Sequence, residues 1–583
     1  MRSAVSSSSF FGFLVSVSRR AFSSGDGASG VRRLKNVPSR HRAAALCHAR
    51  SVLTEYLHVT RSLQFCHAEN IAANSPACLS SLLSRLRFPD DPSQLPGALR
   101  RFLSFRPINE FDFFFESIGL PPLRSACASG HGGGFFLSED TRLVSAVSAL
   151  VRFGFPWTKL GILYRECSSI FSEHADELGD LLISYENLGF DKVAVIGICL
   201  AFPSVLAVDG ISSGREIPAL LEDLKRVISD FHTEGSAEEN VEAYFRLCRR
   251  IRVFYNLGCE KGAMGELLAA SRDLFLQIDE DDLSRKVDFF CRLGMSGDEV
   301  GLFVLRRPEV LQLDLENPSL RMPDYLKQIG LCEEELDSVF LKYPYAMGKN
   351  RLGNLPGVLR AVDLSEFFVR KIRNGGHRYL SPDSDLRISD DEVAEDNDFQ
   401  HELAKTRRVT KSNLVTNKLE FLLGIGFGEN KITLKSLRQL NSTKAQLKER
   451  FDCLLEMGLE YSMICRMVSA TPKLLNQNAD MLRVKIDHLR NNLGCSLEYL
   501  NNFPAYLCFN LENRVKPRYR ILNWLKEVGL LKKTYSPATI LATSEKKFIG
   551  CLLEIHPAAP KQWFEVFSRN HSKEHLRNYD SDG

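Results

Sequence analysis

The chain has 583 residues, of which 44% are apolar and 25% are charged, and its formal net charge is +3. This length exceeds what one compact core can hold, and the composition is that of a globular protein rather than a disordered or fibrous one. No apolar run approaches the roughly 18 residues that span a bilayer, so a membrane-spanning protein is not expected.

The small net charge conceals an uneven distribution. Residues 1–50 hold nine Lys/Arg and one acid, and residues 403–583 hold 29 Lys/Arg and 17 acids. The region between them therefore carries a net charge of −17. A basic C-terminal third behind an acidic body indicates that one end of the molecule meets an anionic partner.

Residues 1–24 have the composition of an organelle transit peptide, because they contain Arg and Ser but no acid. The apolar stretch Phe10–Val17 could also pass for a short secretory segment, but the Ser content and Arg19–Arg20 favour organelle import. Arg20–Ser23 resembles the matrix-processing pattern Arg-x-Phe-Ser, which predicts cleavage near Phe22. We expect the mitochondrial matrix and its nucleoid, with the chloroplast as the alternative.

The stretch Leu293–Leu311 predicts a compact helical unit. Gly294 is a plausible helix C-cap, because glycine reaches the left-handed conformation without a Cβ clash. Apolar residues at +6, +9 and +10 from this glycine share one face of a second helix. Pro308, at +14, cannot continue that helix, and an apolar pair follows at +16 and +17.

The same offsets recur along the chain, with Ser168 and Arg272 in place of the proline in two copies and Pro504 at +10 in another. Most intervals between the glycines lie near 35 residues, which predicts stacked helical units that bury their faces against one another. An interval of 69 predicts two units, one of which lacks its glycine around Leu220–Phe231. The glycines of the repeat are Gly119, Gly154, Gly189, Gly258, Gly294, Gly330, Gly426, Gly458, Gly494 and Gly529.

The 96-residue interval after Gly330 contains two or more units and an acidic insertion. Asp383–Glu402 holds nine acids and one Arg, and it follows Gly375, Gly376 and Pro382. Such a composition buries too little apolar surface to order itself, so a flexible linker is expected. The alternative is an acidic segment that shields the basic surface.

The unit L-G-x₁₃-P-x-h-h resembles the repeat of the mitochondrial transcription termination factor (mTERF) family. The C-terminal segments Phe503–Leu507, Leu511–Arg518, Leu522–Leu530 and Ile540–Phe548 look like that family's signature as well. The resemblance covers roughly residues 105–550 and fits the plant organellar branch best. It implies an all-α, curved α-solenoid of two helices and a short 3₁₀ turn per unit, with a basic concave face that binds double-stranded DNA or RNA.

The predicted function is that of a regulator of organellar transcription, termination and gene expression. It would act as a monomer on double-stranded DNA, without a cofactor or catalytic residues. The alternatives are an RNA-binding factor in transcript processing or ribosome assembly, and a protein–protein scaffold that contacts nucleoid or ribosomal proteins. The predicted regions are a leader (1–24), a divergent helical region (25–100), repeats (101–375), the acidic insertion (376–404), repeats (405–550) and a polar tail (551–583).

The basic run Arg514–Arg520 is the strongest candidate for a nucleic-acid site, because clustered cations neutralise phosphates. Tyr519 and Trp524 could stack on exposed bases if the ligand is RNA. The structural alternative is that Arg514 and Lys516 pair with Glu512 and Glu527. The predicted phosphate contacts are Arg514, Lys516, Arg518, Arg520, Lys532, Lys533, Lys546, Lys547, Arg407 and Arg408.

Other chemistries find little support in the sequence. The fifteen Cys are scattered without a CxxC pair, which argues against a structural zinc site. Gly130–Gly134 lacks the Gly-Lys-Ser/Thr ending of a phosphate-binding loop. His571 and His575 have metal-like spacing but no third ligand. We therefore predict no enzyme, no metal and no cofactor.

Overall fold

The computed structural model describes residue 34 and residues 36–121, 135–172, 177–207, 215–231, 234–381, 390–409, 412–531 and 535–567. These residues fall into two compact units, Met1–Glu280 and Asp281–Gly583, which we call the N-terminal unit and the C-terminal unit. The predicted leader, the Gly-rich run 130–134 and the two histidines of the polar tail lie outside the described residues.

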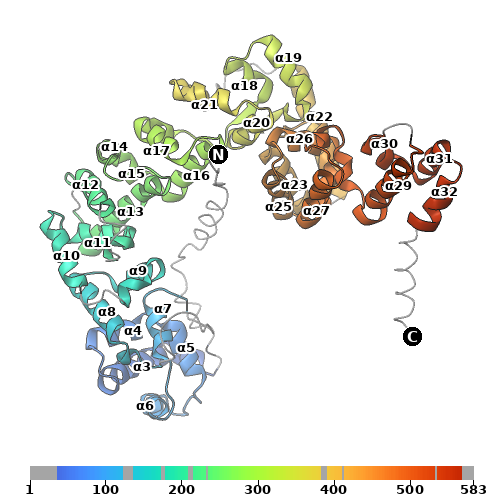
Figure 1. The fold of residues 1–583 in the computed structure, drawn as a ribbon. Coiled ribbons are helices and arrows are strands. Elements are labelled where there is room, and N and C mark those ends of the chain that lie inside the picture. The colour runs from blue at the N-terminus through green and yellow to red at the C-terminus, as the bar shows by residue number, and fades with distance from the viewer. Residues whose placement is uncertain are drawn as a thin grey trace, which may run out of the picture. The chain divides into compact units, whose positions relative to one another are not determined.

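The N-terminal unit is helical throughout its described residues, from the blue to the green part of the chain in Figure 1. Its first helices pack on α3 as a divergent block, and the repeat begins after them. Its helices and short helical turns are η1 (Ser39–His41), α3 (Arg42–Glu55), η2 (Tyr56–Thr60), α4 (Phe65–Ala73), α5 (Pro76–Ser84), η3 (Pro92–Gln94), α6 (Leu95–Phe105), α7 (Glu110–Ser117), η4 (Leu137–Glu139), α8 (Thr141–Phe153), η5 (Trp157–Lys159), α9 (Leu160–Glu166), η6 (Ser168–Phe171), α10 (Leu178–Asn187), α11 (Lys192–Ala201), η7 (Pro203–Leu206), α12 (Glu216–Ile228), α13 (Ala237–Asn256), α14 (Gly265–Ala270) and α15 (Arg272–Gln277).

The C-terminal unit continues the repeat and adds one small antiparallel hairpin, in which Leu320 pairs with Asn350. Its elements are α16 (Glu280–Arg292), α17 (Gly297–Arg306), η8 (Pro308–Gln312), β1 (Ser319–Arg321), α18 (Met322–Gln328), α19 (Glu333–Lys342), η9 (Pro344–Ala346), β2 (Lys349–Arg351), α20 (Leu355–Ala361), α21 (Ser365–Arg373), η11 (Gly376–Leu380), α22 (Asp390–Val409), α23 (Ser412–Gly424), α24 (Lys431–Gln439), α25 (Lys444–Glu456), α26 (Tyr461–Ala470), η12 (Pro472–Asn476), α27 (Ala479–Asn491), α28 (Tyr499–Asn502), η13 (Pro504–Cys508), η14 (Leu511–Val515), α29 (Lys516–Glu527), α30 (Pro537–Ala542), α31 (Glu545–Ile555), α32 (Ala559–Gln562) and η15 (Trp563–Phe567).

The predicted helical repeat is confirmed. All ten glycines of the repeat have positive φ, between 63° and 110°, and each follows a helix as a left-handed turn residue. In the unit of Gly294, Ser296 and Glu299 then form a capping box that starts the second helix, α17. Pro308 begins the 3₁₀ turn η8, whose Val310 and Leu311 are buried. The fold class is therefore an all-α solenoid of helix pairs with a short turn.

One unit has aspartate at the position of the repeat glycine. Asp363, 33 residues after Gly330, has φ 58° and separates α20 from α21. The apolar offsets are partly kept, because Val369, Ile372 and Leu380 are buried at +6, +9 and +17, whereas Arg373 stands at +10 and His377 at +14. Aspartate tolerates the left-handed region better than most residues do, so the unit folds without glycine.

The two copies without proline differ from each other. Ser168 still begins a 3₁₀ turn, η6, whereas Arg272 begins the short α-helix α15. The interval between Gly189 and Gly258 also departs from the pattern, because its second half is one 20-residue helix, α13. Among the described residues of this interval, the second unit thus lacks both its glycine and its 3₁₀ turn.

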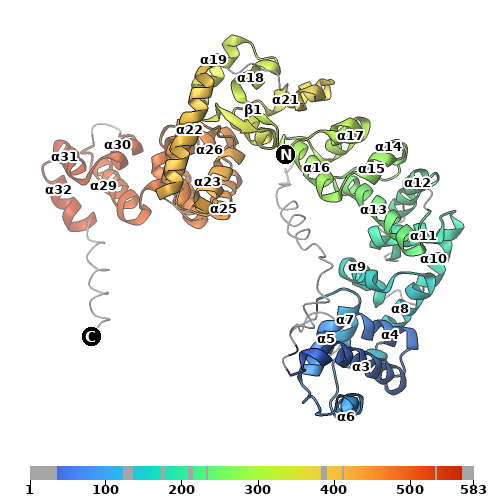
Figure 2. The ribbon, with the colours of Figure 1, turned by 180° about the vertical axis from the view of Figure 1, so that it is seen from behind.

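The acidic insertion is not a flexible linker throughout the predicted range 376–404. Gly376–Leu380 forms η11, and the 20-residue helix α22 begins at Asp390. The helix lies against α23 in Figure 2 and also packs on α24. Phe399 and Leu403 are buried at helical spacing. Their burial stabilises the docked helix, and residues 390–404 are helical where a flexible linker was expected.

Candidate nucleic-acid interface

The basic run Arg514–Arg520 lies at a helix start. The Asn510 side chain accepts the N–H of Asn513 at 2.8 Å and caps η14, a single π-helical turn that leads directly into α29. Pro517 stands in the first turn of α29, where its missing N–H costs no intrahelical bond. Lys516 and Arg520 are four residues apart and therefore share one face of this helix.

Arg518 points into the protein rather than outward. Its side chain is only 3% exposed, and its guanidinium donates to the carbonyl oxygens of Ile540 at 2.9 Å and Thr543 at 2.8 Å. It also forms an ion pair with Glu545 at 2.7 Å and stacks over the Phe548 ring. The donors of this buried guanidinium are taken up inside the protein, so Arg518 holds neighbouring segments together and a phosphate contact there stays a prediction.

Arg514 has a similar role one turn earlier. Its guanidinium donates to the carbonyl oxygens of Leu541 at 2.7 Å and Thr543 at 2.9 Å, and it lies over the Phe509 ring. Burial lowers the pKa of this guanidinium from its usual value. A phosphate contact at Arg514 stays a prediction as well, and its partners here are carbonyls and not Glu512 or Glu527, the carboxylates of the structural alternative.

These arginines belong to a wider pattern in which a cation of a unit's first helix binds the end of the next turn. A basic residue stands eight positions before the glycine in four units and donates to a carbonyl oxygen at the C-terminal end of the following turn or helix. Such ends carry unsatisfied carbonyls and partial negative charge. The pairs are Arg250 with Phe275, Lys286 with Leu311, Lys418 with Leu440, and Arg450 with Leu475.

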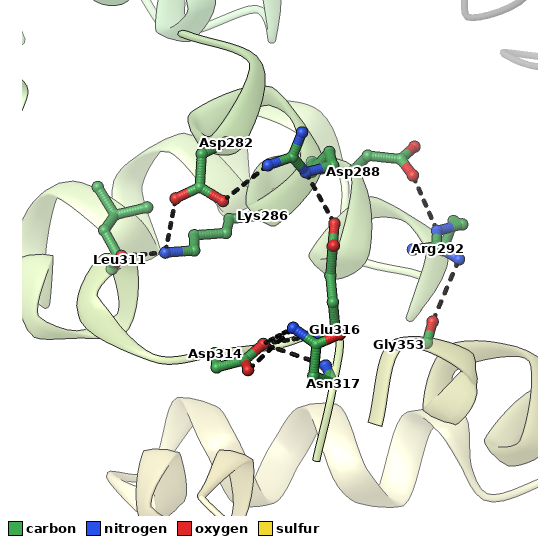
Figure 3. Close-up of polar contacts among 10 residues, drawn as sticks. Asp282, Lys286, Asp288, Arg292, Leu311, Asp314, Glu316, Asn317 and Gly353 are labelled. Carbon is green, nitrogen blue, oxygen red and sulfur yellow. Dashed lines mark hydrogen bonds and ion pairs between the residues drawn. The ribbon is translucent and has the colours of Figure 1, made fainter. Parts of the chain in front are cut away.

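Lys485, nine positions before Gly494 and so one position earlier in its unit, makes the equivalent bond to the Leu507 carbonyl oxygen at 2.7 Å. Burial lowers the pKa of both Lys418 and Lys485. Figure 3 shows the bond between Lys286 of α16 and the Leu311 carbonyl oxygen of η8. Several cations of the basic C-terminal third thus hold neighbouring units together and are not available to an external anion.

A cavity of about 430 Å³ lies beside Lys286, between α16 and the segment that follows η8. Its charged groups pair with one another: Arg285 with Glu316 at 2.8 Å, and Arg292 with Asp288 at 2.8 Å (Figure 3). Asp314 accepts the backbone N–H of Glu316 at 3.0 Å and closes the adjoining loop. The lining holds four carboxylates and three cations, so the cavity has no surplus of positive charge that would select an anion.

Lys516 and Arg520 form the outward face of the basic run. Lys516 is half-buried and pairs with Glu512, as the structural alternative predicted, whereas Arg520 is exposed. Burial lowers the pKa of His488 on α27, and the nearby Lys516 and Arg520 lower it further, whereas Glu512 raises it. The basic run therefore reaches the neighbouring unit, and His488 joins it without any signal in the sequence.

The remaining predicted contacts are placed apart from one another. Lys546 and Lys547 are exposed in the first turn of α31, directly after Glu545, the ion-pair partner of Arg518. Arg407 and Arg408 are exposed in the last turn of α22, which packs on α23 and α24. The other two predicted contacts, Lys532 and Lys533, lie outside the described residues.

Sequence reasoning also passed over exposed cations outside the basic run. Arg490 on α27, Lys526 on α29 and Lys473 in η12 are all exposed. In the sequence, each is a single basic residue within an apolar pattern. Such a residue can be exposed or can bind a carbonyl of a neighbouring turn, and the sequence does not distinguish the two.

The described residues contain neither a candidate membrane span nor a candidate metal site. None of their helices combines the length and apolar character needed to cross a bilayer. Within the same residues, no three His, Cys, Asp or Glu side chains gather in a way that could hold a metal ion.

The mTERF family model matches residues 147–355 and 408–549 of the chain. These ranges include the repeat glycines from Gly154 to Gly529 and the whole basic run. The chain belongs to the mTERF family. The predicted family is thereby confirmed, and the gap between the two matched ranges contains Asp363 and most of α22.

Curated mTERF proteins resemble the chain over most of its length. Transcription termination factor MTEF18, mitochondrial, from Arabidopsis thaliana is 42% identical over 546 residues, covering 93% of this chain and 96% of the relative. MTERF15, mitochondrial, from the same plant is 21% identical and covers 72% of this chain and 81% of the relative. MTERF8, chloroplastic, also from this plant, is 21% identical and covers 66% and 79%.

Proposed function

We propose that this mTERF protein binds mitochondrial nucleic acid, with double-stranded DNA as the ligand, and regulates transcription and its termination. The observation that carries the proposal is the match to the mTERF family over both ranges of the chain, supported by relatives named transcription termination factors. Catalysis is no part of the proposal.

The leader and the comparisons agree on the compartment. The Arg- and Ser-rich residues 1–24 predict import, and the 42% identical relative that covers nearly the whole chain is named mitochondrial. The relatives named chloroplastic are 21% to 33% identical to this chain. Three of them match 18% of the chain or less. The chain is accordingly assigned to mitochondria.

Binding would be mainly electrostatic. The exposed cations Arg520, Lys546 and Lys547, together with Lys516, supply positive charge at the C-terminal end of the repeats. Arg407 and Arg408 supply a second group on α22, and Lys532 and Lys533 remain predicted contacts. Arg514 and Arg518 act indirectly, because they hold α29 against the segment that carries Lys546 and Lys547.

A salt titration of DNA affinity tests this proposal. Each phosphate neutralised by a cation contributes about −0.9 to the slope of log Kobs against log salt concentration. We expect the chain to bind a double-stranded DNA with a clear negative slope, and the triple variant R520E/K546E/K547E to weaken binding and reduce the magnitude of the slope by about 2 to 3.

A charge-matched variant in the N-terminal unit is the control. Arg101, Arg152 and Arg215 are exposed there, and R101E/R152E/R215E changes the net charge by the same amount. This variant should leave the slope nearly unchanged. Equal losses in the two triple variants would show a general charge effect, and absence of any salt-dependent binding would overturn the proposal.

RNA is the second candidate ligand. Tyr519 and Trp524 are both half-buried on α29, so part of each ring is accessible for stacking on an unpaired base. Competition between duplex DNA and a single-stranded RNA of equal length distinguishes the two ligands. Preferential binding of RNA that is lost in Y519A, with DNA binding unchanged, would favour the RNA-binding role.

A further inference from the structure

His488 lies where two neighbouring units meet at the basic run. It belongs to α27, six residues before Gly494, and its ring is half-buried. The Nδ1 atom lies 3.3 Å from the hydroxyl of Tyr506, a fully buried residue of η13. The ring is therefore held by the next turn of the repeat and does not swing freely in solvent.

The Tyr506 hydroxyl determines which nitrogen of the neutral ring carries the proton. Its single proton is donated to the carbonyl oxygen of Lys485 at 3.0 Å. Its oxygen is thus left to accept from His488, so Nδ1 carries the proton and Nε2 is the bare nitrogen. In the neutral ring, Nε2 therefore cannot donate a hydrogen bond to an external anion.

Three charged groups of the following segments act on this ring. Lys516 and Arg520 of α29 disfavour its protonated form, and Glu512 of η14 favours it. Burial is the largest influence, and the net result is a pKa below the usual histidine value. At neutral pH the ring is therefore uncharged, although it lies beside two cations.

We propose that His488 is a third anion ligand of the Lys516 and Arg520 face, and that it contacts a backbone phosphate of bound nucleic acid in its protonated form. This inference rests on the proposed nucleic-acid binding. In the protonated ring Nε2 becomes a donor, so one phosphate can be held by three cations from two units. The phosphate then stabilises the imidazolium that Lys516 and Arg520 disfavour in the free protein.

Binding and protonation are consequently linked. A phosphate diester stays anionic throughout the histidine range, so a change of affinity with pH must come from the protein. Between the pKa of the free protein and the higher pKa of the complex, binding takes up one proton, and affinity rises by up to about tenfold for each pH unit that the pH falls. Above the pKa of the complex the affinity no longer depends on this group.

The experiment measures the affinity of the full chain for one double-stranded DNA at constant ionic strength, from about pH 5.5 to pH 8. We expect affinity to rise as the pH falls in the wild-type chain. H488Q should bind with the affinity that the wild type has at high pH and without this rise. H488K, which keeps a permanent charge, should bind tightly at every pH.

His401 supplies the matched control, because it is exposed on α22 and lies on another element. H401Q should keep the full pH dependence. E512Q provides a second variant, since loss of the Glu512 carboxylate removes the charge that favours protonation of His488. The rise in affinity should then begin at a lower pH than in the wild type.

Circular dichroism and thermal melting establish that each variant is folded. A pH dependence that persists in H488Q, or a wild-type affinity that does not change with pH, would overturn the role of His488. Failure of the underlying function gives a different result, because the chain would then show no salt-dependent DNA binding at any pH.

Discussion

The arginines of the basic run are of two kinds, buried and exposed, which the sequence alone does not distinguish. Arg518 is 2% exposed, whereas Arg520, two residues later on the same helix, is exposed. The difference follows from the helical period, since the position of Arg518 faces the core that contains Ile521 and Phe548. A positive charge at this site is stable because carbonyls and a carboxylate surround it.

Substitution of Arg518 should therefore cost stability. R518A leaves two buried carbonyls without their donor and removes the ion pair with Glu545, a half-exposed partner. We expect a loss of about 2–3 kcal/mol in the stability of the C-terminal end, after discounting for the exposure of Glu545. Hydrogen exchange of residues 535–567 measures it, with faster exchange as the expected result.

R520A is the matched comparison on the same helix. Its side chain is exposed, so the exchange rates of residues 535–567 should stay close to those of the wild type while DNA affinity falls. Equal protection of residues 535–567 from hydrogen exchange in R518A and in the wild type would contradict the structural role of Arg518.

The burial of Arg514 and Arg518 could not be predicted from the run itself. Their partners, Leu541 and Thr543, are 25 to 29 residues away and contribute backbone carbonyls, which have no sequence signature. The pairing of Lys516 with Glu512 was foreseen, because both residues lie four apart on one helical turn. Local pairs are readable from sequence, and pairs that arise from stacking are not.

At the scale of the element, the glycine turn serves two purposes that the repeat pattern does not distinguish. Gly294 has φ 104° and open space where a side chain would stand. Gly426 has φ 105°, but a Cβ there would lie 2.6 Å from both the Ala361 Cβ and the Gly357 carbonyl oxygen. The first glycine supplies only a backbone conformation, and the second also allows two units to approach closely.

Asparagine substitutions separate these two purposes, since asparagine tolerates positive φ. G294N should change the free energy of unfolding by less than about 1 kcal/mol. G426N should cost about 1–3 kcal/mol, because Ala361 and the backbone of α20 must shift to admit a side chain. Thermal melting of both variants measures the difference, and equal melting temperatures would contradict the close approach.

The helix α22 also carries a testable claim. Its Phe399 side chain is 4% exposed, and its Glu402 pairs with Arg438 of α24 at 2.6 Å. F399A removes the main apolar contact and should destabilise the docked helix by about 3 kcal/mol. Hydrogen exchange across residues 396–408 should then increase strongly, whereas exposed H401Q should leave it unchanged. Fast hydrogen exchange of these residues in the wild type would contradict the docked helix and favour a flexible linker.

Repeat units were predictable from sequence wherever glycine and proline marked them. A further unit was expected in the interval after Gly330, but its start at Asp363 was not located, because the pattern required glycine and only some of its apolar offsets are kept. The helix α22 was missed because acidic composition outweighed two apolar residues four positions apart. In both elements tertiary burial decided the structure, and local composition did not.

At the scale of the whole molecule, the net charge is a poor guide to the binding surface. Residues 403–583 carry a surplus of twelve positive charges, yet Lys418, Arg450, Lys485 and Arg518 bind turn carbonyls instead of solvent. The remaining exposed cations define the proposed interface. Because the acidic charge of residues 51–402 would repel a phosphate backbone, we expect nucleic acid to bind at the C-terminal end.

Cross-linking in isolated mitochondria tests the central claim most directly. The nucleic acid joined to this protein by ultraviolet light is sequenced, and the joined peptides are identified by mass spectrometry. We predict mitochondrial DNA as the recovered nucleic acid, with cross-linked peptides between residues 403 and 567 that include α29 or α31. Recovery of protein partners alone, or of cross-links confined to residues 51–280, would contradict it.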